Sequence, residues 1–413
     1  MSGKTGTKGA QTFLQIEDAR RVLAHLITAT PTLHSAGLSR LSGRAVWLKA
    51  ENLQLTGSFK VRGAYNRISR LKKRRGVIAA SAGNHAQGVA LAATMLGLPS
   101  TIVMPEETPL IKVDRTRAHG AGIVLHGSTF EDAFRKASQI GRAKGLTFIH
   151  AYEDRDVIAG QGTIGLEILE AVADLDAIIV PVGGGGLISG IALAAKSLNP
   201  TVKLIGVQAR NAAPTVRAFQ RKKPAHGHAG ETVADAIRFK KASAVTMPIL
   251  RSWVDEMVDV TEEEISEAIV RLMEESKLVA EGAGAVGVAA LLSGRIPAKL
   301  RKVCVVISGG NIDLNMAARV LEQGLSRSNR YLVLRSQIPD KPGRLFGMLA
   351  HLVERKINVL DVRHNRAGWK IPLGSVEVEL LVETRNAGHA AEIIASLTKA
   401  GYRVERAERG EAP

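Results

Sequence analysis

One lysine stands where a positive charge is unfavourable. Lys60 comes directly after Gly57, Ser58 and Phe59, and apolar residues recur at helical spacing from Val61 onward. Lys60 therefore falls in the first turn of a predicted helix, where the helix dipole destabilises a cation. Such an amine loses its proton more readily, and a neutral amine can attack a carbonyl carbon. Taken alone, Lys60 could equally be an ordinary surface lysine.

The predicted Lys60 helix has candidate signals at both ends. Thr56 or Ser58 could cap its start, because hydroxyl side chains accept hydrogen bonds from free amides there. Four basic residues and then Gly76 follow the apolar pattern. Cations in the last turn and a glycine after it are typical of a helix C-terminus.

A run of four glycines could hold an anion. It lies between a strand predicted at 177–182 and a helix predicted at 187–198, and consists of Gly183, Gly184, Gly185 and Gly186. Backbone amides at a helix N-terminus bind phosphate groups. The run lacks the Gly-Lys-Ser/Thr of a Walker loop and the spaced glycines of a dinucleotide-binding loop. We interpret it as a phosphate-binding loop rather than a flexible linker.

Two further loops place polar groups at the ends of predicted strands. The first opens a helix and contains Ser81, Ala82, Gly83, Asn84 and His85. Its amides and polar side chains could bind a carboxylate or a phenolate, although an isolated helix cap has the same composition. Ser308 follows a buried strand, where its hydroxyl could face a ring nitrogen or only complete a turn. No metal-binding spacing such as His-Glu-x-x-His occurs, so we predict no metal site.

Strands and helices alternate from residue 45 to residue 307. Strands are predicted at 45–49, 77–80, 101–104, 123–126, 147–150, 177–182, 204–208 and 303–307. Helices separate most of them, which is typical of a parallel α/β sheet. Thr261 and Glu264 form a capping box for a further helix that extends to about Lys277. Residues 211–247 show no pattern clear enough to assign.

The order of elements changes at about residue 327. Strands are predicted at 331–338, 359–364, 375–382 and 402–405, with helices at 344–354 and 387–397. This βαββαβ order is that of a ferredoxin-like unit. We therefore expect a separate small domain at the C-terminal end.

Length and composition narrow the class of protein. A chain of 413 residues with 45% hydrophobic residues is expected to form two or three domains. The first 11 residues are polar, look disordered and contain no apolar signal segment, and no apolar run is long enough to span a bilayer. The single Cys304 lies in an apolar run, as expected of a buried thiol in a reducing compartment. We therefore expect a cytoplasmic protein.

The positive net charge does not indicate nucleic-acid binding. The chain has 56 basic and 39 acidic residues, but only 4% aromatic residues to stack on bases, and no nucleic-acid-binding motif. A solvated basic surface is the simpler interpretation.

Six motifs in one order resemble the threonine and serine dehydratases, which use pyridoxal 5'-phosphate. They are ENLQ (51–54) with GSFKVRGA (57–64), SAGNHAQG (81–88), IAGQGT (158–163), PVGGGGL (181–187), EGAGA (281–285) and SGGN (308–311). The resemblance implies the tryptophan-synthase-β-like architecture, fold type II of these enzymes. A large cofactor-binding domain would comprise 1–56 and 153–325, and a smaller α/β domain, 57–152, would be inserted in it.

The resemblance also implies roles for individual residues. The cofactor would be bound by Phe59, Lys60, Asn84, Gly183, Gly184, Gly185, Gly186, Leu187 and Ser308. Lys60 would hold it covalently, Asn84 would contact its ring hydroxyl, and Ser308 would face its ring nitrogen. The substrate carboxylate would bind at Ser81, Ala82, Gly83 and His85. Lys60 and Ser81 would be the catalytic residues, with Lys60 removing the Cα proton.

The reaction implied is loss of water and ammonia from L-threonine to give 2-oxobutanoate, with L-serine giving pyruvate. Serine racemases resemble this chain, but they have a serine at Ala82 and acidic metal ligands at Gln208 and Pro214. We therefore expect elimination rather than racemisation, and no bound metal. A 3-hydroxyaspartate dehydratase and a catalytically silent amino-acid sensor remain alternatives. The sensor is disfavoured because Lys60 and Asn84 are retained.

Residues 327–408, with Asp340, Lys341, Pro342 and Gly343 in one turn, resemble an ACT domain. Such domains often bind amino acids where two copies meet, which implies a homo-oligomer, a dimer or a tetramer. The unit could bind a regulatory amino acid such as isoleucine or valine, or it could only join subunits. Biosynthetic relatives carry a doubled regulatory region and simple catabolic ones carry none. A single unit therefore leaves both isoleucine biosynthesis and catabolism open.

Overall fold

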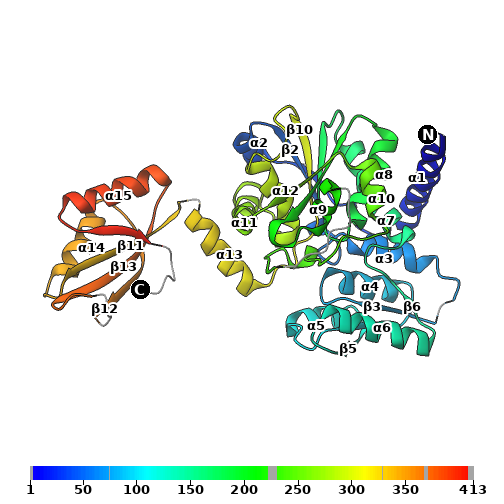
Figure 1. The fold of residues 1–413 in the computed structure, drawn as a ribbon, viewed down its shortest axis with the longest axis horizontal. Helices are drawn as coiled ribbons and strands as arrows, with labels where there is room; N and C mark the ends of the chain where they lie inside the picture. Colours follow the sequence, from blue (N-terminus) through cyan, green and yellow to red (C-terminus); the bar gives the residue numbers. More distant parts are fainter. Residues whose placement is uncertain (1–2, 74, 222–229, 328, 367–370, 408–413) are drawn as a thin grey trace. The chain divides into compact units, whose positions relative to one another are not determined.

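The computed structural model describes residues 3–73, 75–221, 230–327, 329–366 and 371–407. The chain forms two compact units, Met1–Leu314 and Asn315–Pro413 (Figure 1). Helix α13 (Leu314–Arg327) belongs almost entirely to the second unit, whereas the sequence analysis placed the boundary near residue 326.

The first unit is built on a six-stranded sheet with the order β1-β2-β10-β7-β8-β9. Its strands are β1 (Thr32–His34), β2 (Ala45–Ala50), β7 (Ala177–Pro181), β8 (Lys203–Ala209), β9 (Glu256–Val260) and β10 (Lys302–Ile307). Every pair is parallel except β1 with β2. The predicted parallel α/β core is therefore confirmed.

Helices cover both faces of this sheet (Figure 1). The long helices α7 (Arg155–Ala171) and α8 (Gly186–Leu198) pack against each other and contribute to the main apolar core with β7 and β8. Helix α12 (Gly282–Leu292) contacts β7, β8 and β10, and α11 (Glu262–Ser276) packs on α12. Strands buried on both faces explain why their sequences are continuously apolar.

A smaller parallel sheet has the order β5-β4-β3-β6. Its strands are β3 (Val77–Ala80), β4 (Ser100–Met104), β5 (Gly122–Leu125) and β6 (Thr147–Phe148). Side chains of β3 alternate between two cores: Val77 and Ala79 pack with α3 (Lys60–Ser69) and α4 (Asn84–Met95), while Ile78 and Ala80 pack with α6 (Phe130–Lys144). Helix α5 (Leu110–Ala118) lies between β4 and β5 in the chain.

The second unit has an antiparallel sheet with the order β12-β13-β11-β14. The strands are β11 (Tyr331–Pro339), β12 (Val359–Asn365), β13 (Ser375–Glu383) and β14 (Val404–Ala407), and the helices are α14 (Arg344–Glu354) and α15 (Ala387–Lys399). This is the predicted ferredoxin-like unit. Its apolar core joins one face of the sheet to both helices and is separate from the cores of the first unit.

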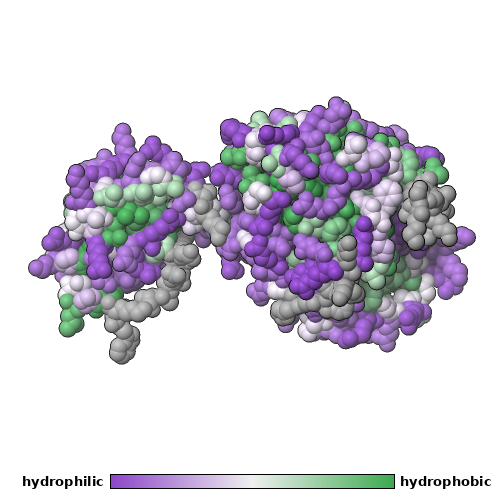
Figure 2. All heavy atoms as spheres, turned by 45° about the horizontal axis from the view of Figure 1, so that its top comes forward, coloured by the Kyte–Doolittle hydropathy of each residue, from purple (hydrophilic) through white to green (hydrophobic). Residues whose placement is uncertain are grey.

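The surface of the described residues is mainly hydrophilic on the face drawn in Figure 2. None of the described helices is long and apolar enough to cross a membrane.

Several local predictions are wrong. The segment expected to be disordered at the start is helical from Gly3, in α1 (Gly3–Leu23). Helix α3 ends at Ser69, well before Gly76, and neither Thr56 nor Ser58 caps it, because its N-cap is Phe59 with no side-chain hydrogen bond.

The sequence predicts a helix over 163–172, which begins earlier in the structure, and several other elements were not anticipated. Helix α7 begins at Arg155 because the Asp154 carboxylate accepts bonds from two first-turn amides. The sequence analysis also missed β1, β9, α13 and the short α2 (Ala36–Ser42).

The unassigned stretch 211–247 contains little regular structure among its described residues. They include α9 (Pro214–Arg221), the single turn η3 (Asp235–Ile237) and the start of α10 (Met247–Trp253), while η2 (Arg210–Ala212) leads into the stretch. Residues 222–229 lie outside the described part.

Candidate active site

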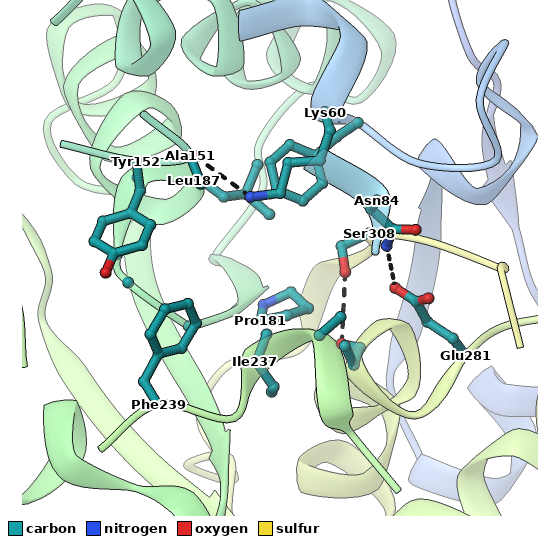
Figure 3. Close-up of a pocket in the computed structure, with 17 residues that line it drawn as sticks. Lys60, Asn84, Ala151, Tyr152, Pro181, Leu187, Ile237, Phe239, Glu281 and Ser308 are labelled. Carbon is teal, nitrogen blue, oxygen red and sulfur yellow. Dashed lines mark hydrogen bonds between the residues drawn. The ribbon is translucent and has the colours of Figure 1, made fainter. Parts of the chain in front are cut away.

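A pocket of about 500 Å³, including space open to solvent, lies within the first unit (Figure 3). Its lining comes from the starts of α3 and α4, the loops after β6, β7 and β10, the η3 segment and the start of α12. The lining residues are Phe59, Lys60, Asn84, Ala151, Tyr152, Pro181, Gly183, Gly184, Gly185, Gly186, Leu187, Ala236, Ile237, Phe239, Glu281, Ala283 and Ser308. The structure thus brings together every residue that the sequence analysis assigned to cofactor binding.

Lys60 is the first residue of α3, and its amine points into the pocket (Figure 3). The Nζ atom donates a long hydrogen bond of 3.4 Å to the carbonyl oxygen of Ala151 and lies 5.0 Å from the centre of the Phe59 ring. Burial lowers the pKa of Lys60 from 10.5 to about 8, and the charge of Glu281 opposes this shift. The direction agrees with the sequence argument, but burial is the main cause.

Backbone contacts to the loop after β10 fix the start of α3. The amide of Phe59 donates to the carbonyl oxygen of Ser308 (3.2 Å), and the amide of Gly310 donates to the carbonyl oxygen of Gly57 (2.9 Å). The Ser58 hydroxyl, predicted as a cap, is buried and has no hydrogen-bond partner in the part of the chain that the structure describes. Lys60 is therefore positioned by backbone pairing with Ser308 and its neighbours.

The glycine run connects β7 to α8. The Thr215 hydroxyl donates to the carbonyl oxygen of Gly183 (3.3 Å), and the Thr246 hydroxyl donates to that of Gly184 (2.7 Å). In a trans peptide the carbonyl and the following amide point in opposite directions. The amides of Gly184 and Gly185 therefore point away from the two threonines. They add to the free amides in the first turn of α8, which suit an anion.

Glycine is required in this run because two aromatic rings pack against it. A Cβ atom at Gly184 would lie 2.5 Å from the Tyr152 ring, and one at Gly183 would lie 2.7 Å from the Phe239 ring. Gly185 has a φ of 88°, which favours glycine. The two rings pack edge to face, 5.2 Å apart. They lie together in Figure 3, apart from Asn84 and Glu281.

A chain of polar groups occupies the other part of the pocket (Figure 3). Asn84 Nδ2 donates to Glu281 Oε1 (2.7 Å), and Asn84 Oδ1 accepts from Asn311 Nδ2 (2.8 Å). Among the described residues, the Ser308 hydroxyl has only a long contact of 3.5 Å to the carbonyl oxygen of Ala283. Burial, followed by the charge of Asp235, raises the pKa of Glu281 from 4.5 to about 7.

The residues predicted to bind the substrate carboxylate do not line this pocket. The Ser81 hydroxyl accepts a hydrogen bond from the amide of Gly83 (3.2 Å), which is the N-cap of α4. His85 is buried and donates from Nε2 to the carbonyl oxygen of Ile149 (2.9 Å). Burial, followed by the charge of Lys60, lowers the pKa of His85 to about 3, so the ring is neutral. The catalytic role of Ser81 and the substrate-binding roles of Ser81, Ala82, Gly83 and His85 therefore remain predictions.

The sequence analysis missed three prominent side chains of the pocket. Tyr152 follows the predicted strand at 147–150, and Glu281 is the first residue of the EGAGA motif. Their places at a strand end and in a motif were signals that could have identified both as site residues. Phe239 lies in the stretch 211–247, where no pattern was available.

The structure also shows what Gln208 does. Its Oε1 accepts hydrogen bonds from the amides of Thr215 and Val216 (3.0 Å each) in the first turn of α9. Gln208 therefore satisfies backbone amides in place of a separate cap. Among the described residues, no group of three or more His, Cys, Asp or Glu side chains could hold a metal ion.

Comparisons with known proteins agree with this geometry. The family described as "Pyridoxal-phosphate dependent enzyme" matches residues 23–309. The L-threonine ammonia-lyase of Thermotoga maritima is 47% identical over 396 residues, which are 95% of this chain and 98% of that protein.

Two solved structures are similar to this chain over about three quarters of its length. The processed form of threonine deaminase isoform 2 from Solanum lycopersicum has a TM-score of 0.72 and 35% identity, covering 77% of this chain and 88% of that chain. Maize serine racemase has a TM-score of 0.72 and 32% identity, covering 76% of this chain and 98% of that chain.

Proposed function

The chain belongs to the pyridoxal-phosphate-dependent enzymes, and we propose that it converts L-threonine to 2-oxobutanoate and ammonia as an L-threonine ammonia-lyase. The observation that carries the proposal is the convergence of the Lys60 amine with the glycine run, Asn84 and Ser308 in one pocket. The similarity to a named L-threonine ammonia-lyase over 95% of the chain supports the same conclusion.

The residues present fit pyridoxal 5'-phosphate. The amides of Gly184 and Gly185 are directed away from the threonine-bound carbonyl oxygens of Gly183 and Gly184, so they are not used by those two contacts. These amides and the N-terminus of α8 would hold the phosphate. Asn84 would contact the ring hydroxyl and Ser308 the ring nitrogen. When bound, the cofactor would supply an electron sink that takes up the electron pair of the Cα–H bond as the proton leaves.

Lys60 has the properties of the base in this reaction. With a pKa of about 8, its amine is neutral in roughly a tenth of the molecules at pH 7, a far larger share than for a lysine with the ordinary pKa of 10.5. A neutral amine at the pocket can hold the cofactor covalently and later accept the Cα proton of the substrate. The apolar and aromatic lining, including Tyr152, Ile237 and Phe239, would exclude water from the proton transfer.

The proposal of elimination over racemisation depends on Ala82. A racemase needs an acid on the opposite side of Cα from the lysine to return the proton, and alanine cannot supply one. Maize serine racemase is similar in structure at 32% identity, so the chemistry at this position, rather than the fold, would distinguish the two activities.

The test is to mix the purified protein, loaded with pyridoxal 5'-phosphate, with L-threonine. We expect 2-oxobutanoate to accumulate as the visible absorption band shifts, and the Lys60→Ala variant to do neither. L-Serine, which we propose as a second substrate giving pyruvate, and 3-hydroxyaspartate are compared in parallel. A band that shifts with no oxo acid from any of them would contradict the proposal and indicate an amino-acid sensor.

We further propose that the second unit binds an amino-acid effector. A cavity there is lined by Ile338, Pro339, Asp340, Lys341, Pro342, Gly343, Arg344, Leu345, His364, Arg366 and Val376. The Asp340 carboxylate suits an ammonium group, and the first amides of α14 suit a carboxylate. The apolar side chains of Ile338, Leu345 and Val376 suit a branched side chain such as that of isoleucine or valine.

We also propose that the protein is a homo-oligomer in the cytoplasm. Strand β12 is an edge of its sheet, with Leu360 and Val362 partly exposed beside the open backbone groups. Phe346 and Val353 of α14 are 75% and 69% exposed. An open edge and exposed apolar side chains favour pairing with a second copy. Mass photometry of the purified chain would give the subunit count, and a monomer at micromolar concentration would contradict the proposal.

A further inference from the structure

Glu281 is an unusual residue for its place in the chain. It is the N-cap of α12, yet its side chain makes no capping hydrogen bond, whereas N-cap positions favour short polar side chains that cap the helix. The carboxylate instead accepts a hydrogen bond from Asn84 at the start of α4, a helix that packs against the smaller sheet. Glu281 is only 6% exposed. Burying a carboxylate without strong compensation is costly, so its presence in the pocket calls for a role.

The contacts of Asn84 fix the direction of its amide. The carbonyl oxygen of Thr56 can only accept, so the Asn311 atom 2.7 Å from it must be Nδ2. The same Nδ2 donates to Asn84, which therefore presents Oδ1 to Asn311.

Asn84 Nδ2 must then face Glu281, whose Oε1 accepts one of its hydrogens. The second Nδ2 hydrogen has no acceptor among the described residues and remains for a group in the pocket. Glu281 thus holds the donor end of Asn84 at the pocket.

Charged groups from several elements surround Glu281. Lys60 of α3 and Lys112 of α5 favour its ionised form, and Asp235 of η3 disfavours it. Lys112 and Asp235 also form an ion pair with each other (2.7 Å), so their opposing effects are linked. The pKa of Glu281 is about 7 and that of Lys60 is about 8, and each charge favours the ionised form of the other.

We propose that Glu281 is a positioning residue that orients the Asn84 amide toward the cofactor ring, and that its carboxylate also acts as a negative charge on the Lys60 amine, which lines the same pocket. This inference rests on the proposed function of the pocket. It assigns two separable effects to one side chain: a hydrogen-bond acceptor for Asn84 and a negative charge for Lys60.

The experiment uses the full chain without cofactor. The reactivity of Lys60 toward acetic anhydride is followed by mass spectrometry as a function of pH in the wild-type protein, Glu281→Gln and Glu281→Ala. Glu107→Gln, the same change at an exposed position, is the control. We expect the midpoint for Lys60 to fall by roughly one pH unit in both Glu281 variants, because a favourable charge is removed. The control should titrate as the wild type does.

The second measurement is the affinity of each protein for pyridoxal 5'-phosphate, followed by its visible absorption. In Glu281→Gln the glutamine can still accept a hydrogen bond from Asn84, so the affinity of this variant for the cofactor should stay near that of the wild type. In Glu281→Ala the alanine cannot accept this bond. The affinity of that variant for the cofactor should therefore fall roughly tenfold, the value of one lost hydrogen bond to a buried group.

Two results would overturn the proposal. One is an unchanged midpoint for Lys60 in the folded Glu281→Gln protein, since a purely structural role would alter stability without moving this titration. The other is equal cofactor affinity in the glutamine and alanine variants. Because the titration needs neither cofactor nor turnover, it stays informative even if L-threonine proves not to be the substrate.

Discussion

Lys60 is held in the folded protein with little to compensate its charge. Its amine makes one long hydrogen bond, 3.4 Å to a carbonyl oxygen, and lies near one aromatic ring. Within the described part of the chain it forms no salt bridge, and Glu281 acts on it only as a nearby charge. The neutral amine that we propose as the base is therefore obtained at the expense of stability.

Lys60→Met should stabilise the cofactor-free protein at pH 7. The pKa of Lys60 is 10.5 when exposed and about 8 in the folded state. The unfolded chain therefore binds more protons between these values, and wild-type stability rises with pH across that window. The loss of stability caused by burying the protonated Lys60 amine is complete below about pH 8 and absent above pH 10.5. At pH 7 we expect a gain of at most on the order of 3 kcal/mol in the free energy of unfolding.

Urea unfolding of the cofactor-free variant at pH 7 and pH 10 would measure this gain. Lys72→Met, at an exposed lysine, is the matched control and should change stability little. Equal stability of Lys60→Met and the wild type at pH 7 would show that the amine is not penalised by burial.

Residue type and spacing identified some site residues and not others, for physical reasons. Lys60 is a cation in the first turn of a helix, where the helix dipole is unfavourable for it. The four glycines have low helix propensity and directly precede a helix. Both features can be recognised from neighbouring residues alone. Tyr152 and Phe239 matter because they pack on Gly184 and Gly183, and these contacts join segments far apart in the chain. The role of the Glu281 side chain is likewise visible only through its contact with Asn84.

At the scale of elements, Arg62 fixes the helix that carries Lys60. The Arg62 side chain is fully buried and donates to both carboxylate oxygens of Glu51 (2.8 Å each). It also donates to Glu167 (2.9 Å) and to the hydroxyl of Thr163 (3.1 Å), both on α7. These bonds connect α3 to the end of β2 and to α7. They raise the pKa of Arg62 above its ordinary value, although burial opposes them.

Arg62→Met should destabilise the protein strongly. Removing one member of a buried ion cluster leaves the remaining charges uncompensated, which typically costs about 3–5 kcal/mol. Arg70, one position beyond the end of the same helix, pairs with Asp18 where both side chains are partly exposed. Arg70→Met should therefore cost less than about 1 kcal/mol. Urea unfolding would measure the loss in the free energy of unfolding for each variant. Equal losses would mean that Arg62 does not hold α3 in place more strongly than Arg70 does.

Elements were predictable where their signals are local. The capping box of Thr261 and Glu264 is present as predicted, with α11 running from Glu262 to Ser276. The start of α3 near Lys60 was predicted, but the way it is held was not, because backbone bonds to Ser308 and Gly310 fix it rather than a side-chain cap. Helix α7 was assigned too short because Gly160 and Gly162 lower its helix propensity, whereas tertiary packing retains them. A Cβ atom at either glycine would lie within 2.8 Å of other parts of the chain.

At the scale of the molecule, the two units have separate apolar cores. All residues that line the candidate active site lie in the first unit, and the cavity proposed for an effector lies in the second. The order of the elements predicted this division, because a βαββαβ sequence cannot continue a parallel sheet. The boundary itself was not predictable, since α13 carries no signal that assigns it to one side.

A chain that ends at residue 314 should keep its activity on L-threonine and lose any response to branched amino acids. A unit with its own core is expected to fold alone, so its turnover should stay within roughly twofold of the full chain. If isoleucine or valine binds at the second unit, it can change turnover only where that unit is present.

A second variant that ends at residue 327 retains α13 and tests whether that helix is needed for folding. The measurements are circular dichroism and 2-oxobutanoate formation with and without each amino acid. A folded but inactive shortened chain would show that the second unit contributes to catalysis, and a retained response would place the effector site in the first unit.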